Sequence, residues 1–221
     1  TAGGALFAAF PHVYATMFST FYLALFLMLL ALIMRGMAFE LRNRHESLSW
    51  HRFWDGAIFF GSALPAFLWG VAVTNLLRGL PINAHMIYTG SFFNLLSPYT
   101  IMGGLAFFFV FTFHGAAFLT LRLASGGLLI RLRHLAQQIG LAAIVCFVFC
   151  ILLTYTNTDL FHSTPAVLLL FGAALSFVIA YVCTSAEKYV PGFVLSSLAI
   201  ALTTAAFFAG LFPRLMVSSI H

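Results

Sequence analysis

The chain has 221 residues, of which 62% are hydrophobic and only 7% are charged. A soluble domain has about 25% charged residues, so this composition excludes a soluble protein and indicates an integral membrane protein. The formal net charge of +5 at pH 7 does not indicate a nucleic-acid partner. The basic residues fall in short segments between apolar runs, where membrane topology accounts for them.

Six apolar runs are long enough, or nearly so, to cross a bilayer as helices, which needs about 20 residues each. We expect these spans at residues 8–34, 56–78, 98–121, 136–155, 165–183 and 191–212. The breaks between them carry Pro, Gly, Asn or charged residues, as loops do. The sequence therefore predicts an all-α integral membrane protein, a polytopic helix bundle that forms a single transmembrane domain over residues 1–221.

The basic residues indicate the orientation of this bundle. Most of the ten follow the first, third and fifth expected helices: Arg35, Arg42, Arg44, Arg52, Arg122, Arg131, Arg133 and Lys188. Arg78 and Arg214 lie on the other side. By the positive-inside rule, loops 35–54, 122–134 and 184–190 are cytoplasmic. Thr1 and His221 are then both expected on the outer side.

Histidines and cysteines are the first candidates for a cofactor or metal site. A haem held by two imidazoles needs two facing histidines at similar depth, but only His114 lies well inside an expected span. His12 lies near the outer end of the first span, and the others are in loops or at ends: His45, His51, His85, His134, His162 and His221. We therefore expect His114 to be a hydrogen-bonded packing residue. We interpret the three cysteines, Cys146, Cys150 and Cys183, as small core residues rather than metal ligands.

A group of charges marks one membrane–water boundary. The segment RGMAFELRNR (35–44) places Arg35, Glu40 and Arg42 there, and Asp55 begins the next expected helix. Such charges commonly anchor helix ends by reaching toward water. A carboxylate beside an arginine at a water-filled opening can instead stay ionised and collect protons. Composition alone does not choose between these two interpretations.

A second polar patch is expected at the opposite boundary, formed by Asn75, Arg78 and Asn94. Helix capping and hydrogen bonding within the loop account for it most simply, and contact with a quinone or a lipid headgroup is the alternative. Three pairs of adjacent glycines are most simply close-packing or turn sites: Gly3–Gly4, Gly103–Gly104 and Gly126–Gly127.

Five blocks of sequence resemble subunit II of the cytochrome bd quinol oxidase family. They are TAGGALFAAFPHVYA (1–15), RGMAFELR (35–42), WDGAIFFGSALPAFLWGVAVTNLLRGLP (54–81), YTGSFFNLLSPYTIMGGL (88–105) and GLFPRLMVSS (210–219). The first and third blocks are specific, whereas the last three helices otherwise match the family only in hydropathy and position. With them, the resemblance covers essentially the whole chain.

The resemblance implies a haem-free subunit of a bacterial plasma-membrane oxidase that oxidises quinol and reduces oxygen to water. In this family, subunit I is expected to hold the quinol site and the haems b and d. Subunit II is expected to pack against it and to contribute to a proton path. The resemblance leaves room for a structural quinone or lipid and for small accessory subunits.

The resemblance also implies roles for three residues. Glu40 matches the acidic residue at the mouth of the proton path, and Arg35 matches the arginine before it. Asp55 matches the aspartate of a Trp-Asp pair, for which we expect helix capping. The family has eight helices in two four-helix bundles, and here its first and last helices, with an acidic motif before residue 1, are expected to be absent.

Two other functions are weighed against this one. A six-helix secondary transporter would use broken helices and polar groups at the bilayer midplane, and few midplane charges are present. A self-contained membrane cytochrome b would need more than one histidine inside the spans.

Overall fold

The computed structural model describes residues 2–83, 87–123, 126–214 and 216–218. Its α-helices are α1 (Ala2–Ala9), α2 (Pro11–Thr20), α3 (Tyr22–Leu41), α4 (Leu48–Arg78), α5 (Pro98–Arg122), α6 (Gly127–Asn157), α7 (Thr164–Ser185) and α8 (Tyr189–Leu211). Short 3-10 helices are η1 (Arg42–Arg44), η2 (Phe92–Leu95) and η3 (Asp159–His162). Within these described residues, six helices are long and apolar enough to cross a membrane, which confirms the predicted all-α polytopic fold.

The first expected helix, over residues 8–34, is wrong in its bounds. The chain is interrupted at Phe10, directly before the proline that opens α2, and again at Phe21 between α2 and α3. Proline is favoured in the first turn of a helix because its missing N–H has no partner there. The first membrane-spanning helix therefore begins at Tyr22, and His12 lies in α2 rather than near the end of a span.

Several helices extend further than the apolar runs predict. Helix α4 begins at Leu48 and α6 at Gly127, and each has 31 residues. At 1.5 Å per residue such a helix is about 46 Å long, whereas the hydrocarbon core is about 30 Å thick. The excess carries polar residues, so the expected loops at 35–54 and 122–134 are largely helical. The loop expected at 184–190 is shortened in the same way by α7 and α8.

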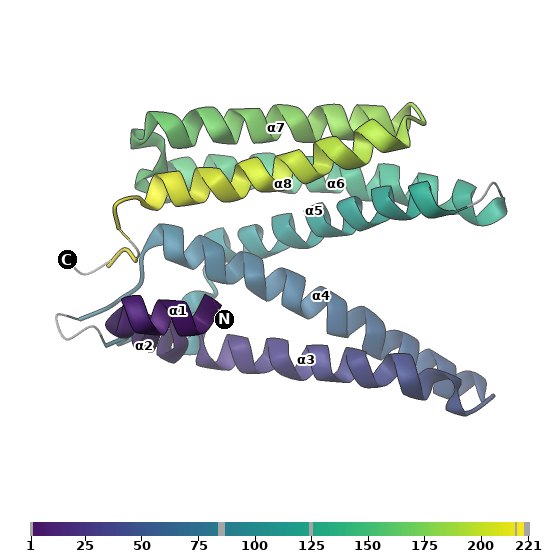
Figure 1. The fold of residues 1–221 in the computed structure, drawn as a ribbon, viewed down its shortest axis with the longest axis horizontal. Coiled ribbons are helices and arrows are strands. Elements are labelled where there is room, and N and C mark those ends of the chain that lie inside the picture. Colours follow the sequence, from purple (N-terminus) through teal and green to yellow (C-terminus); the bar gives the residue numbers. More distant parts are fainter. Residues whose placement is uncertain (1, 84–86, 124–125, 215, 219–221) are drawn as a thin grey trace. The chain divides into compact units, whose positions relative to one another are not determined.

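The contacts divide the chain into two compact units. Unit 1 comprises the described residues of 1–75, 79–104 and 218–221. In it α3 and α4 form an antiparallel hairpin (Figure 1). Gly61 lets them meet, since a Cβ there would lie 2.7 Å from both the Ala31 oxygen and the Arg35 Cβ. Of the glycine pairs, Gly103 and Gly104 are close-packing sites, because added Cβ atoms would collide with the Thr74 and Phe67 side chains. The other two pairs are not close-packed, since a Cβ added at Gly3, Gly4, Gly126 or Gly127 would have no heavy atom within 4 Å.

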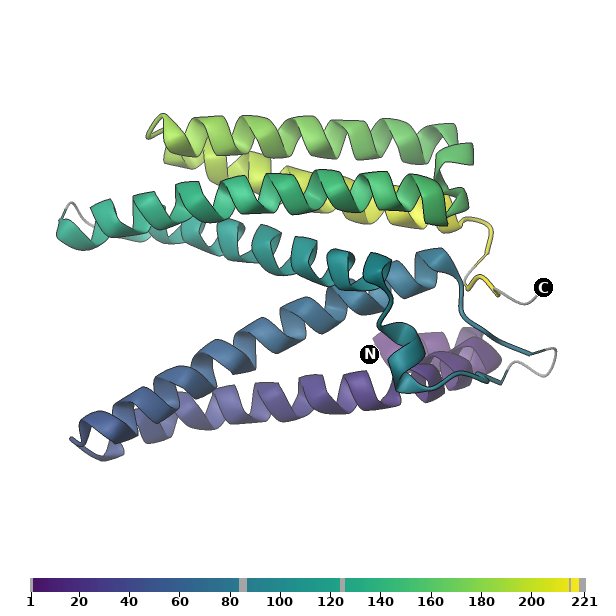
Figure 2. The same ribbon diagram turned by 180° about the vertical axis from the view of Figure 1, so that it is seen from behind.

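Unit 2 comprises the described residues of 76–78 and 105–217. Its helices α5, α6, α7 and α8 lie side by side as a four-helix bundle in both views (Figures 1 and 2). One cluster of its core takes buried residues from all four helices: Phe113, Ala143, Phe177, Ala180 and Ala199. Small side chains at such positions let helices approach closely where lipid supplies no hydrophobic driving force. The single transmembrane domain over residues 1–221 stays a prediction.

Candidate functional site

The charged boundary group lies at the turn between α3 and α4, within unit 1. Helix α3 continues through Glu40 to Leu41, and η1 then carries Arg42 and Arg44. Only residues 45–47 separate η1 from α4. The turn is therefore short enough to bring side chains from the end of one helix beside the start of the next.

Asp55 is held by Arg42. The Arg42 Nε donates to Asp55 Oδ1 at 2.6 Å, and Nη2 donates to Oδ2 at 3.3 Å. Such two-pronged pairing fixes the geometry of both groups. Because α4 begins at Leu48 with Ser47 before it, Asp55 lies two turns into the helix. The expectation that Asp55 caps this helix is wrong, and its carboxylate instead ties the end of α3 to α4.

Glu40 is held much more loosely. Its side chain is 75% exposed, and its ion-pair partner is Arg44, whose Nη2 lies 3.2 Å from Glu40 Oε1 in an i, i+4 arrangement. Exposed pairs of this kind contribute little to stability because water screens them. Of the two carboxylates, Glu40 is the one whose charge can change without breaking a contact between α3 and α4.

Arg35 does not join these pairs. Its guanidinium carbon lies 5.7 Å from the centre of the Phe39 ring, and no ion pair links it to a carboxylate of the described residues. The structure therefore places all three predicted site residues on one hairpin. The arginines that form ion pairs with Asp55 and Glu40 are Arg42 and Arg44, and not Arg35.

Sequence reasoning missed an aromatic group that supports the turn. The Trp50 Nε1 donates to the Leu41 oxygen at 2.8 Å, which satisfies a carbonyl at the end of α3. The Trp50 ring also contacts His45 and Trp54, with ring centres 5.0 and 5.6 Å apart. Tryptophan is enriched at membrane–water boundaries. The two tryptophans beside the charged segment could therefore have indicated an aromatic group at this boundary.

His114 lies in the bundle of unit 2 and is engaged there. Its Nδ1 is 2.8 Å from the Ser196 Oγ, and its ring stacks on Phe193 with centres 4.8 Å apart. This confirms the predicted hydrogen-bonded packing role. Within the described residues, no group of three or more His, Cys, Asp or Glu could hold a metal ion. His85 and His221 lie outside the described residues.

The described residues do not fit a haem with two imidazole ligands. Such a haem needs a second histidine facing the first at a similar depth. Of the other histidines described in unit 2, His134 lies in the third turn of α6 and His162 lies in η3, whereas His114 is deep within α5.

The residues of the predicted second polar patch do not all act together. Its two asparagines form hydrogen bonds in the loop region, and its arginine lies apart from them. The buried Asn75 donates from Nδ2 to the Val71 and Leu95 oxygens, both at 2.8 Å. The Asn94 Oδ1 accepts from the Ser91 hydroxyl at 2.8 Å. For both asparagines, hydrogen bonding within the loop region is confirmed. Arg78 makes neither of these contacts.

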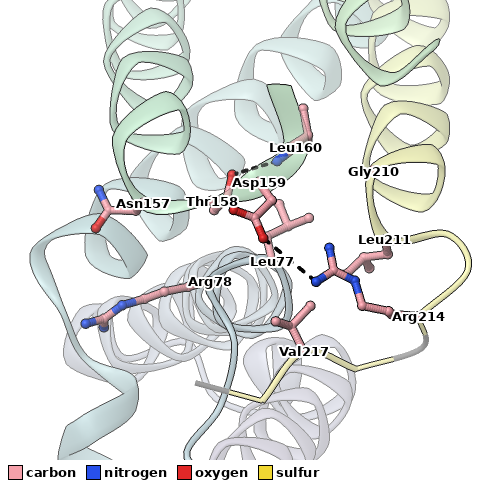
Figure 3. Close-up of a pocket in the computed structure, with 10 residues that line it drawn as sticks. All are labelled: Leu77, Arg78, Asn157, Thr158, Asp159, Leu160, Gly210, Leu211, Arg214 and Val217. Carbon is pink, nitrogen blue, oxygen red and sulfur yellow. Dashed lines mark hydrogen bonds and ion pairs between the residues drawn. The ribbon is translucent and has the colours of Figure 1, made fainter. Parts of the chain in front are cut away.

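Arg78 instead lines a hollow in unit 2, of about 80 Å³. Its wall is formed by Leu77, Arg78, Asn157, Thr158, Asp159, Leu160, Gly210, Leu211, Arg214 and Val217. The Arg214 Nη1 lies 3.8 Å from Asp159 Oδ2. Figure 3 shows Arg214 directed at Asp159, with Arg78 extending away from that pair. Sequence reasoning missed this site because its members come from three distant segments.

Comparison with known proteins gives a consistent match. The family model for cytochrome bd terminal oxidase subunit II matches residues 1–221. The cytochrome bd ubiquinol oxidase subunit 2 of Bacillus subtilis (strain 168) is 39% identical over 227 residues, covering 100% of this chain and 66% of that protein. The cytochrome bd-I ubiquinol oxidase subunit 2 of Escherichia coli (strain K12) is 43% identical over 151 residues, covering 66% of this chain and 40% of that protein.

A probable cytochrome oxidase subunit 2 of Haemophilus influenzae is 40% identical over 152 residues, covering 67% of this chain and 40% of that protein. The chain thus spans less than two thirds of the length of these curated relatives.

Proposed function

Because the chain belongs to the cytochrome bd terminal oxidase subunit II family, we propose that it acts as the haem-free second subunit of a bd-type oxidase. The complex would oxidise quinol and reduce oxygen to water in a bacterial plasma membrane. The observation that carries this proposal is the family match over residues 1–221. The six apolar helices agree with a multi-pass subunit of such a complex.

The first part of the proposed role is to support a haem-bearing subunit I. In this proposal the haems b and d and the quinol site belong to that partner, and accessory subunits, a structural quinone or lipids complete the complex. The position of His134 in the third turn of α6 and of His162 in η3, away from the depth of His114, supports a chain that ligates no haem. Helix α3 also presents large exposed apolar side chains, including Tyr22, Phe26 and Leu29, which suit contact with lipid or with a neighbouring membrane subunit.

The second part is proton delivery from the cytoplasmic side. The ends at which α3 meets α4, α5 leads to α6 and α7 leads to α8 would face the cytoplasm under the positive-inside rule. Glu40 would collect protons there, because it is exposed and weakly paired. Asp55 would instead hold the turn through Arg42, and Arg35 would keep the local potential positive beside them. The rate of oxygen reduction by a Glu40→Gln complex tests this role.

The experiment that tests the subunit assignment is a reduced-minus-oxidised absorbance spectrum. The full-length subunit would be purified in mild detergent, alone and co-expressed with its neighbouring subunit. Haem bands that appear only when the partner is present are the expected result. Haem bands on this subunit alone would contradict the haem-free role, and a complex without haem would contradict the oxidase assignment.

A further inference from the structure

His114 and Ser196 form a polar contact between α5 and α8 at the depth of the membrane interior. His114 lies eight residues before the end of α5, and Ser196 lies seven residues after the start of α8. Both are thus about 10–12 Å from the same end of the bundle. The two helices are about 35–38 Å long, little more than the hydrocarbon core of about 30 Å. We therefore expect both side chains to lie within the core, away from water.

The hydrogen bonds of Ser196 determine which ring nitrogen of His114 carries the hydrogen. The Ser196 hydroxyl donates to the Phe193 oxygen at 2.8 Å, and a hydroxyl has only one hydrogen to donate. In the contact of 2.8 Å between His114 Nδ1 and Ser196 Oγ, the donor must therefore be Nδ1–H. An isolated charge is very costly away from water, so we expect a neutral imidazole. Its other nitrogen, Nε2, is then a hydrogen-bond acceptor.

The Nε2 atom of His114 has no hydrogen-bond donor within the described part of the chain. The polar contact of the ring is the one to Ser196, and its aromatic contact is stacking on Phe193, with ring centres 4.8 Å apart. Among the described residues, the side-chain nitrogens and oxygens that are buried without a partner do not include this Nε2. The half-buried His114 ring therefore presents its acceptor nitrogen at the surface of the bundle.

The surface of α5 beside His114 is open to a neighbour. Phe118, one turn further along α5, is 41% exposed, and its ring centre lies 5.6 Å from that of Phe193. A Cβ added at Gly115 would have no heavy atom within 4 Å. At this depth the neighbour is either a lipid acyl chain or a protein helix. An acyl chain has no hydrogen-bond donor, and an acceptor left without one away from water is unfavourable. The acceptor therefore favours a helix that carries a donor.

We propose that Nε2 of His114 accepts a hydrogen bond from an O–H or N–H donor on a transmembrane helix of the partner subunit. Ser196 is the positioning residue, because accepting Nδ1–H fixes both the tautomer and the orientation of the ring. Gly115, beside His114, lets the backbone of the incoming helix approach α5 closely. The inference rests on the proposed function and deepens it, since it names one contact between the two subunits.

Two substitutions separate the bond to Ser196 from the proposed bond to the partner. The amide of glutamine reaches as far from the backbone as Nε2, whereas that of asparagine reaches only as far as Nδ1. We expect His114→Asn to weaken association with the partner about threefold, the effect of one hydrogen bond between membrane helices. His114→Gln should weaken it less. Ser197→Ala, which removes a hydroxyl bonded to its own helix, is the control and should leave association unchanged. Dissociation of the full-length complex in graded detergent measures these differences.

A 15N NMR spectrum of the full-length complex labelled with [15N]histidine tests the bond itself, with the His114→Gln complex identifying the His114 signals. We expect a protonated Nδ1 and an unprotonated Nε2 whose signal shifts when the subunit is studied without its partner.

Three outcomes would overturn the proposal: a protonated Nε2, an Nε2 signal that is the same with and without the partner, or equal weakening of association by His114→Asn and His114→Gln. The reduced-minus-oxidised spectrum of the same samples reports separately on the proposed function. A complex that contains haem but gives one of these outcomes contradicts this inference alone, whereas a complex without haem contradicts the proposed function.

Discussion

The interior of the α5–α8 bundle and the turn between α3 and α4 are held by different kinds of contact. In the bundle, buried alanines such as Ala143 and Ala180 pack beside Phe113 and Phe177, whose ring centres are 5.3 Å apart. At the turn, the main link is the Arg42–Asp55 ion pair, with both side chains substantially exposed. The stability of the bundle therefore depends on how closely its side chains pack, whereas that of the turn depends on an ion pair that is exposed to water. Changes of charge at the turn are therefore expected to affect stability less than changes of volume in the bundle.

The largest effect is expected from adding one methyl group to the bundle. In Gly140→Ala, the new Cβ would lie 2.7 Å from Tyr181 Cδ2 and 2.9 Å from Phe113 Cδ2. Overpacking of this kind costs about 1–3 kcal/mol of unfolding free energy. We expect a clearly lowered midpoint of thermal unfolding for the purified complex in detergent.

The same substitution in α7 is the matched control. In Gly172→Ala the nearest heavy atom, Leu202 Cδ1, would lie 3.6 Å from the new Cβ, which is ordinary contact. Replacing a mid-helix glycine by alanine then raises the unfolding free energy by about 0.5–1 kcal/mol. Equal destabilisation by both variants would show that close packing at Gly140 is not what holds the bundle.

A smaller effect is expected from removing an arginine at the polar helix ends, and it should differ between the two units. Arg133, in α6, donates from Nη1 to Glu187 Oε1 at 2.6 Å and from Nη2 to the Tyr189 hydroxyl at 2.5 Å. Its side chain is only 26% exposed. Arg133→Gln should lower the unfolding free energy by about 1 kcal/mol. The loss is no larger because water screens the exposed Glu187.

Arg42→Gln provides the comparison, because Arg42 also bonds a carboxylate but is more exposed. Thermal unfolding of both variants measures the difference. A larger loss for Arg42→Gln than for Arg133→Gln would contradict the view that the α3–α4 turn tolerates changes of charge.

The apolar features of this fold could be predicted from the sequence. Six runs of hydrophobic residues gave six membrane-spanning helices, because burial in lipid depends mainly on composition. The single interior histidine, His114, indicated a packing role that the contact with Ser196 confirms. Adjacent glycines were a weaker indication, because Gly103 and Gly104 are close-packed whereas the pairs Gly3–Gly4 and Gly126–Gly127 are not.

The polar features could be predicted only in part. Hydropathy locates the apolar part of a helix and not its ends, so the start of α4 at Leu48 was missed and Asp55 was wrongly expected as a cap. The break at Phe21 has no Gly or Pro to mark it, whereas Pro11 was a usable signal for the break before α2. The Asp159–Arg214 pair joins residues far apart in sequence, which only the folded bundle brings together.

The central claim is that Glu40 collects protons for an oxidase whose haems lie in the partner subunit. The measurement that tests it most directly is the rate of oxygen reduction by the purified complex carrying Glu40→Gln. Glu46→Gln is the matched control, because Glu46 is also exposed and lies in the same turn.

We predict that Glu40→Gln slows oxygen reduction about tenfold, the low end of the effect of focused surface charge on association rates. Haem content should stay unchanged, and Glu46→Gln should retain the full rate. An unchanged rate in Glu40→Gln would contradict the proposed role of Glu40 in proton delivery.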